Sequence, residues 1–271
     1  MDRIAQLIHD CSIELSPRDE FAGEALRGLV RSGATVFVNY PSSVSHHDIV
    51  AACVRLRRAG FDPVPHVAAR RLASFTQASD FLLRAVNEAG VERILLIGGD
   101  DSPIGPFRAS LDLLATGVVE RSGVRAVSFG GYPEGHPAID TATLDAALRA
   151  KISLARQAGL LVSVVTQFGF EAEPIKRWIE ARAEGCPVHV GIAGPASVAT
   201  LAKFAIRCGI GTSLRALARG HTAFARVLVE AAPDELIGQL VASGAPIGGL
   251  HLYTFGGVRR VAEWIQRRVS G

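Results

Sequence analysis

The sequence predicts a (β/α)8 barrel, an α/β fold in which eight parallel strands alternate with helices. Two observations predict it. About eight short apolar runs recur along the 271 residues, and such nearly continuous runs are typical of strands buried on both faces. Amphipathic helical stretches lie between the runs, and repeated strand–helix alternation is the pattern of this barrel. A doubly wound open sheet is the alternative, weakened by the lack of GxGxxG after the first strand.

The expected strands are all rich in Val, Ile and Leu. They cover residues 11–15, 34–38, 64–68, 93–97, 124–129, 160–165, 188–192 and 248–253. Helices are expected at residues 44–58, 75–89, 141–157 and 174–183. Several of these helical stretches end in Ala-Gly, a helix stop signal. The longer helical stretch at 196–239 predicts an extra helix before the last strand. No linker or composition break divides the chain, so we expect a single domain over residues 1–271.

Composition excludes several classes of protein. The formal net charge is +3, from 29 basic and 26 acidic side chains, whereas nucleic-acid binders concentrate basic charge. The four cysteines form no CxxC pair, which predicts reduced, buried thiols rather than a zinc ribbon or redox site. The apolar runs are too short to span a bilayer, and the N-terminal residues lack the apolar core of a signal peptide. We therefore expect a cytoplasmic protein without nucleic-acid or membrane partners.

In such a barrel the catalytic residues lie at the C-terminal ends of the strands and in the loops that follow them. Glu14 ends the first strand between apolar Ile13 and Leu15, which favours a general acid with a raised pKa, the alternative being an ion pair at the core edge. Gly99 lets a flat ligand approach the backbone, although the neighbouring Asp100 could instead cap the next helix.

The other polar groups at strand ends leave structural alternatives open. His66 could be a structural histidine, residues 132–137 a rigid turn, and Gln167 a polar residue that fills the barrel. His46 and His47, at a helix start, are expected to face solvent. The histidines show neither HxH nor HExxH spacing, so no metal site is predicted.

The motifs at the strand ends resemble, in order, those of the methylenetetrahydrofolate reductase family. They are SIELSP, PVPHVAA, LLIGGDDSP, GGYPEGHP, VTQFGFE, GIAGP and HLYTF. The resemblance runs from residue 12 to about residue 264, and the family fold is a (β/α)8 barrel. It implies a flavin-dependent oxidoreductase of one-carbon metabolism that interconverts 5,10-methylenetetrahydrofolate and 5-methyltetrahydrofolate. The implied cofactor is FAD, the hydride donor is NADH or NADPH, and assembly into a homo-oligomer is left open.

The resemblance also implies roles for individual residues. Glu14 matches the general acid that protonates a folate nitrogen, and Asp100 matches the carboxylate that stabilises the cationic iminium. Gln167, Tyr253 and Phe255 match substrate-binding positions. The positions that match FAD contacts are Asn39, His66, Gly99, Asp100, Gly130, Tyr132, His136, Asp145 and Lys151.

The chain also departs from the family pattern. Gly98 stands where the family usually has arginine, which should weaken binding of the flavin phosphates. Asn39 replaces a usual threonine, and Phe255 is followed by glycines rather than a polar pair. Residues 208–244 match poorly. Two alternatives follow: a barrel methyltransferase that binds a pterin without redox chemistry, and a non-catalytic folate-binding protein.

Overall fold

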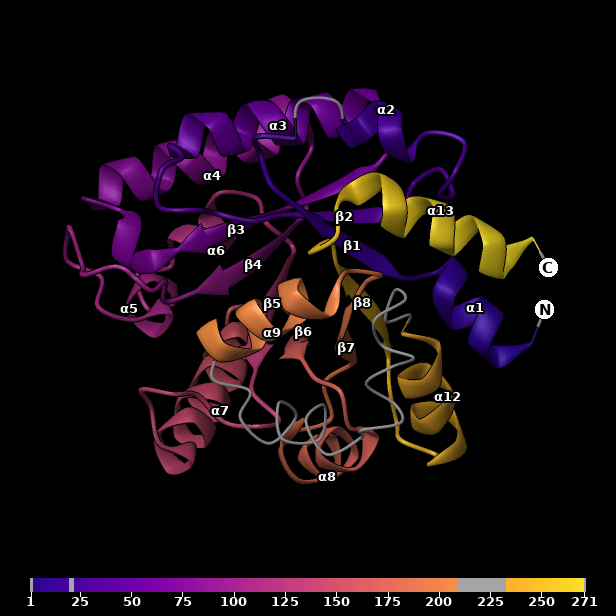
Figure 1. The fold of residues 1–271 in the computed structure, drawn as a ribbon. Coiled ribbons are helices and arrows are strands. Elements are labelled where there is room, and N and C mark those ends of the chain that lie inside the picture. Colours follow the sequence, from indigo (N-terminus) through magenta and orange to yellow (C-terminus); the bar gives the residue numbers. More distant parts are fainter. Residues whose placement is uncertain (1, 20–21, 209–232, 271) are drawn as a thin grey trace.

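The eight strands form a closed, all-parallel barrel in chain order (Figure 1). The computed structural model describes residues 2–19, 22–208 and 233–270. The strands are β1 (Ser12–Leu15), β2 (Thr35–Val38), β3 (Asp62–Ala68), β4 (Arg93–Ile97), β5 (Ala126–Gly131), β6 (Leu161–Phe168), β7 (Val188–Ala193) and β8 (Gly249–Tyr253). Because β8 pairs with β1, no strand edge is left open. The predicted (β/α)8 barrel is confirmed.

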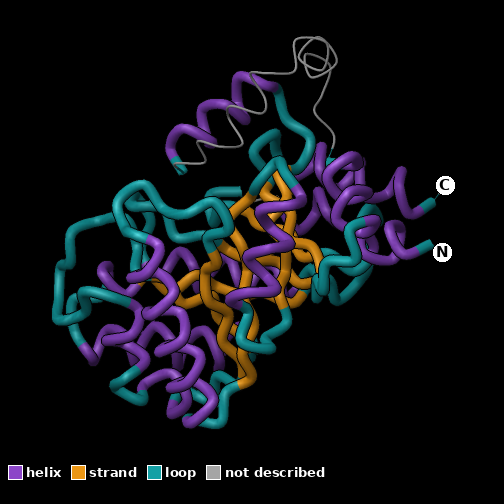
Figure 2. The backbone as a smooth tube through the Cα atoms, turned by 90° about the horizontal axis from the view of Figure 1, so that it is seen from below, coloured by secondary structure: helices purple, strands orange, loops and turns teal. Residues whose placement is uncertain are grey.

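The helices surround this barrel (Figures 1 and 2). They are α1 (Arg3–His9), α2 (Ala22–Leu26), α3 (His46–Arg58), η1 (Ala69–Arg71), α4 (Phe75–Ala89), α5 (Ser110–Leu114), α6 (Val118–Arg121), α7 (Thr141–Gln157), α8 (Ala172–Arg182), α9 (Val198–Arg207), α12 (Asp234–Ala242) and α13 (Val258–Val269). Both α9 and α12 precede β8, which confirms the extra helix. The rest of the stretch predicted as helical, residues 209–232, lies outside the described residues.

Alternation along the strands separates an outer core from the barrel interior. On β1, Ile13 and Leu15 belong to the large apolar core that the helices cover, while Glu14 points the other way because successive strand residues face opposite sides. Inside the barrel, a smaller apolar group fills the middle. Its buried members are Phe37, Val64, Leu95 and Val165.

Polar caps fix where the helices begin after the strands. Ser45, Ser74 and Asp140 each accept a hydrogen bond from a backbone N–H three residues later, which stabilises the first turn of α3, α4 and α7. At the other end of α4, Gly90 has a φ of +61°, the left-handed conformation that the Ala-Gly signal predicts. The loops at the strand ends are therefore anchored on both sides.

The first and last helices, α1 and α13, lie side by side, so the two ends of the chain meet (Figures 1 and 2). None of the four cysteines forms a disulfide in the described structure. Burial is confirmed for Cys11, Cys53 and Cys186, whereas Cys208 is only half-buried. None of the helices in the described ranges combines the length and apolarity needed to cross a membrane.

The N-terminal end of the barrel interior is polar. A small cavity of about 30 Å3 lies there, and its lining includes Ser12, Arg93 and His189. Ser128 and Ser163 complete one side through a 2.8 Å hydrogen bond between their hydroxyls. Burial is the main cause that lowers the pKa of His189 to about 4, with nearby His251 and Arg93 adding to it.

The lowered pKa of this half-buried histidine predicts a loss of stability in acid. His189 is neutral in the folded protein but takes up a proton on unfolding, where its pKa is about 6.5. Its contribution is complete above about pH 6.5, and about 3 kcal/mol is lost as the pH falls towards 4. Chemical denaturation of the parent and His189→Gln across this range should show a smaller loss in the variant. His47→Gln, at an exposed site, is the control and should follow the parent.

Candidate active site

The carboxylate of Glu14 is the centre of a polar cluster at the C-terminal end of the barrel. Its Oε2 lies 3.2 Å from Nε2 of His66 and 3.6 Å from Nε2 of His251. Its Oε1 accepts a 3.4 Å hydrogen bond from Nδ2 of Asn39. The Glu14 side chain is 14% exposed and that of His251 is fully buried. Strands β1, β2, β3 and β8 thus bring four side chains together.

The raised pKa expected for Glu14 is wrong. Burial does raise the pKa and is its largest single influence, but His66 and His251 together outweigh burial and hold it well below the usual range. The expectation was based on Ile13 and Leu15, whose side chains lie in the outer core instead. An unliganded Glu14 is therefore a carboxylate at neutral pH.

Ser12 holds His251 through Nδ1, the ring nitrogen that faces away from Glu14. Ser12 and His251 are partners across the seam where β8 closes on β1, and Oγ of Ser12 lies 2.9 Å from Nδ1 of His251. The ring of Phe37 meets the imidazole edge-on, with 4.6 Å between centroids. These two contacts hold the ring with Nε2 facing Glu14.

Several polar atoms of this cluster lack a well-formed hydrogen bond. Oδ1 of Asn39, Nε2 of His66 and Nε2 of His251 are buried without one among the described residues. Folded proteins rarely leave buried polar atoms in this state, and functional sites are a common exception. Polar atoms left in this state are typical of a site that binds a ligand.

Asp100 lies at the rim, after β4. Its side chain is exposed and forms no ion pair or hydrogen bond with the described residues, whereas the adjacent Asp101 pairs with Arg71 at 3.4 Å. Gly99, with a φ of +93°, lets the chain turn towards the mouth before Asp100. Asp100 is thus a carboxylate without a protein partner in the described part of the chain.

Tyr132 and His136 lie in the loop after β5, and their rings meet edge-on at 5.4 Å. A side chain at Gly130 would come within 3.3 Å of the Tyr132 hydroxyl, so glycine leaves room for the ring there. Burial, and next the charge of Asp100, raise the pKa of Tyr132. The loops after β4 and β5 therefore meet at this rim.

Three aromatic side chains, Tyr253, Phe255 and Phe204, line the part of the barrel mouth next to β8 and α9. Tyr253 stacks on Phe255 with 5.5 Å between ring centroids, and Phe255 stacks on Phe204 of α9 at 4.1 Å. The Tyr253 hydroxyl donates to the carbonyl of Thr166 at 3.0 Å. Nearby, Nε2 of Gln167 donates to the carbonyl of Cys208 at 3.1 Å. The predicted substrate residues thus gather at β6 and β8.

Two predicted cofactor residues are engaged in the helix layer instead. Asp145 of α7 accepts from Nε of Arg182 at 2.8 Å. Lys151, also on α7, lies over the ring of Phe129 at 5.2 Å, and burial lowers its pKa to about 8. Phe129 belongs to the outer core, so the structure does not bring Lys151 to Glu14.

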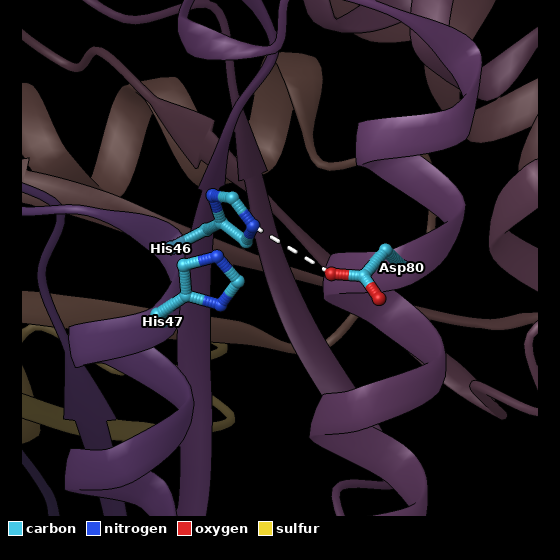
Figure 3. A group of neighbouring side chains, drawn as sticks. All are labelled: His46, His47 and Asp80. Carbon is cyan, nitrogen blue, oxygen red and sulfur yellow. Dashed lines mark ion pairs between the residues drawn. The ribbon is translucent and has the colours of Figure 1, made fainter.

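A second histidine cluster lies outside the barrel, between α3 and α4 (Figure 3). His46, His47 and Asp80 offer donor atoms within 4.8 Å of one another. The expectation that His46 faces solvent is wrong because it is 8% exposed, while His47 is exposed. Nε2 of His46 faces Asp80 at 3.7 Å.

The hydrogen bonds of this cluster favour helix packing over metal binding. Oε1 of Gln77 accepts the Ala73 N–H, which turns its amide nitrogen towards Nδ1 of His46 at 3.4 Å. Nδ1 is then an acceptor, whereas a metal-bound histidine usually donates from its second nitrogen. The guanidinium of Arg84 contacts Nδ1 of His47, which places a cation where an ion would bind.

Sequence reasoning missed two residues of the Glu14 cluster, His251 and Ser12. Both lie in quoted motifs, and the signal was available: Ser12 is two residues before Glu14 and His251 two before Tyr253. Residues two apart on a strand face the same side, so both had to point into the barrel. Their contact depends on the register across the closing seam, which the sequence does not display.

Comparison with known proteins supports the fold alone. No protein-family model matches the sequence. A mutant tryptophan synthase α-subunit from the hyperthermophile Pyrococcus furiosus has a TM-score of 0.55 and 11% identity, over 97% of this chain and 96% of that one. Sialic acid aldolase from Ruminococcus gnavus has 0.52 and 11%, over 96% and 72%. Orotidine 5'-phosphate decarboxylase from Pyrococcus horikoshii OT3 has 0.50 and 13%, over 96% and 99%. These identities are too low to transfer an activity.

Proposed function

We propose that this protein is a flavin-dependent oxidoreductase that interconverts 5,10-methylenetetrahydrofolate and 5-methyltetrahydrofolate, with NADH or NADPH as hydride donor. One observation carries the proposal: Glu14, the residue matching the family's general acid, lies at the barrel mouth amid side chains that can bind and exchange a proton. Asn39 and His66, at positions that match FAD contacts of the family, contact it directly.

The residues at the mouth fit a flavin ring. Asn39 and His66 present buried polar atoms without well-formed hydrogen bonds, which match the donors and acceptors on the edge of such a ring. At Gly98 a side chain would meet none of the described atoms within 4 Å, so the backbone there is accessible to a flat group. Tyr132 and His136 would bound the ring on one side. When bound, FAD would supply hydride transfer between nicotinamide and folate.

The phosphate end of FAD needs a cation that Gly98 does not provide. Arg70, in η1 directly after β3, lies beside the same turn, and its Nη1 donates to the carbonyl of Gly99 at 3.1 Å. Its Nε donates to the carbonyl of Arg108 at 2.7 Å, which holds the guanidinium in place. Arg70 therefore offers a positive charge near the position where the family usually has arginine.

The proposed proton step starts from Glu14. A carboxylic acid there would give its proton to the folate nitrogen, which opens the ring and leaves a cationic iminium. Asp100, without a protein partner among the described residues, would stabilise that cation by its charge. A folate that covers the mouth would also exclude water and strengthen the effect of burial, which favours the protonated form of Glu14.

The proposed function predicts, first, that the protein binds a flavin. Purified protein should bind FAD with micromolar affinity or better, and His66→Ala should weaken binding at least about tenfold if the imidazole supplies a hydrogen bond worth about 1.5 kcal/mol. Flavin fluorescence titration measures this, with His47→Ala on the outer helix as the control. No binding by the parent protein would refute the flavin and favour the pterin-binding methyltransferase.

The second prediction concerns Glu14→Gln. Glutamine keeps the shape and the hydrogen bond from Asn39 but has no proton to give, so conversion of methylenetetrahydrofolate should fall by about 10²–10⁴-fold. Reduction of bound flavin by NADH needs no proton from this group and should stay near the parent rate. Stopped-flow single turnovers separate the two half-reactions, with exposed Glu173→Gln as the control. A parent-like folate half-reaction would exclude Glu14 as the acid.

The third prediction concerns Asp100→Asn. Loss of the charge should slow the folate half-reaction by an amount equivalent to about 2–4 kcal/mol of transition-state stabilisation. Flavin reduction by NADH should change much less, because no iminium forms in it. The same single-turnover experiment measures both rates, with Asp101→Asn as the neighbouring control. Equal losses in the two half-reactions would assign Asp100 to flavin binding or to the fold instead.

A further inference from the structure

The small polar cavity at the N-terminal end of the barrel is distinct from the Glu14 cluster. An apolar layer of buried side chains, which includes Phe37 and Val165, fills the barrel between the two. On β6, Ser163 precedes Val165 and lines the cavity, whereas Gln167 follows Val165 towards the mouth. The cavity therefore belongs to the base of the barrel, and the proposed reaction does not use it.

The lining of this cavity has more hydrogen-bond donors than acceptors. Nε of Arg93 is buried without a hydrogen-bond partner among the described residues. The bond between the hydroxyls of Ser128 and Ser163 uses only one of their two protons, and the described contacts offer the other proton no acceptor. Because buried donors are rarely left in this state, the cavity suits a ligand that only accepts hydrogen bonds.

The charge of the lining points to an anion. Arg93 forms no ion pair with the described residues. Asp10 also lines the cavity, but its carboxylate is 52% exposed and is shared by Arg31 at 3.6 Å and His9 at 3.0 Å. His189 is neutral at neutral pH, because burial lowers its pKa. The cavity thus carries one uncompensated positive charge, which a monovalent anion would match.

The size of the cavity restricts that anion. Its volume is about 30 Å3, and a water-sized particle needs about 10–15 Å3 on this measure. A monatomic ion fits, whereas sulfate, phosphate and organic carboxylates are too large to enter whole. Chloride has the required charge and size and accepts hydrogen bonds without donating any.

We propose that the base of the barrel is a binding site for chloride, held by the Nε–H of Arg93 and by the free hydroxyl proton of the Ser128–Ser163 pair. The cavity exists only when β4, β5, β6 and β7 are assembled, so the anion binds the folded state and stabilises it by mass action. The inference is independent of the proposed function, since it involves neither flavin nor folate.

Bound chloride has a consequence for His189, which lines the same cavity. A nearby anion favours the imidazolium, so chloride should raise the pKa of His189 from its value of about 4. By linkage, chloride should bind more tightly as the pH falls. The other charges that face His189 are Arg93 and His251, which lower its pKa, and Asp10 at the cavity lining.

The test is a titration of the full-length protein with sodium chloride at constant ionic strength. Sodium gluconate replaces the chloride, because gluconate is too large for the cavity. The 35Cl NMR line width measures binding, and the urea midpoint measures stability. Both should respond saturably in the parent. Arg93→Gln should weaken the chloride affinity at least about tenfold, since it removes a hydrogen bond from a charged donor.

Two further variants control this result. Arg125→Gln makes the same change at the same end of the barrel, where the exposed guanidinium pairs with Glu92 at 3.5 Å, and it should bind chloride like the parent. Ser163→Val keeps every charge but fills the cavity with methyl groups, so it should lose the chloride response. This second variant tests the site even where Arg93→Gln does not fold.

The location of the anion is read from 15N-histidine NMR, with the His189 signal assigned by His189→Gln. In the parent, the pKa of His189 should be higher in chloride than in gluconate, and in Ser163→Val the two values should agree. Three outcomes would overturn the proposal: no saturable response of the parent, which would assign the cavity to water alone, an unchanged His189 pKa, or parent-like chloride binding by Arg93→Gln or Ser163→Val.

Discussion

The polar site at the C-terminal end of the barrel depends on one interaction: the compensation of the Glu14 carboxylate, which is buried where β8 closes on β1. A charge out of water needs compensation, and here it comes from Asn39, His66 and His251 on three other strands. Their positions are set by the pairing of β1 with β2 and with β8, and by the pairing of β2 with β3. A local fault in one of these pairings would move at least one of the three groups away from the carboxylate, so the fold and the site depend on the same register.

The fold was predictable because the buried strands are nearly continuous apolar runs and several of the amphipathic helical stretches between them end in an Ala-Gly stop signal. Part of the site was predictable too, since Glu14, Asn39 and His66 lie near the C-terminal ends of consecutive strands and a parallel barrel brings such ends together. The pKa of Glu14 was not predictable from its neighbours in sequence. Ile13 and Leu15 point to the opposite face, and the groups that decide its charge come from residues far along the chain.

The residues that prediction missed or placed elsewhere share a physical cause: their contacts depend on how separate elements are spaced. His251 meets Ser12 only across the closing seam. Asp145 is held by Arg182 and Lys151 by Phe129, because α7 packs these side chains into the helix layer. His46 is buried at the first turn of α3 by its packing on α4 (Figure 3). Helical periodicity places a residue on a face but does not reveal what covers that face.

The most direct test of the central claim is one anaerobic single-turnover experiment on the parent protein. The protein is loaded with FAD, reduced with stoichiometric NADH and mixed with 5,10-methylenetetrahydrofolate while the visible absorption of the flavin is recorded. The oxidised flavin band should return as 5-methyltetrahydrofolate forms, with one mole of flavin oxidised for each mole of product. A flavin that stays reduced in the presence of bound folate would contradict it.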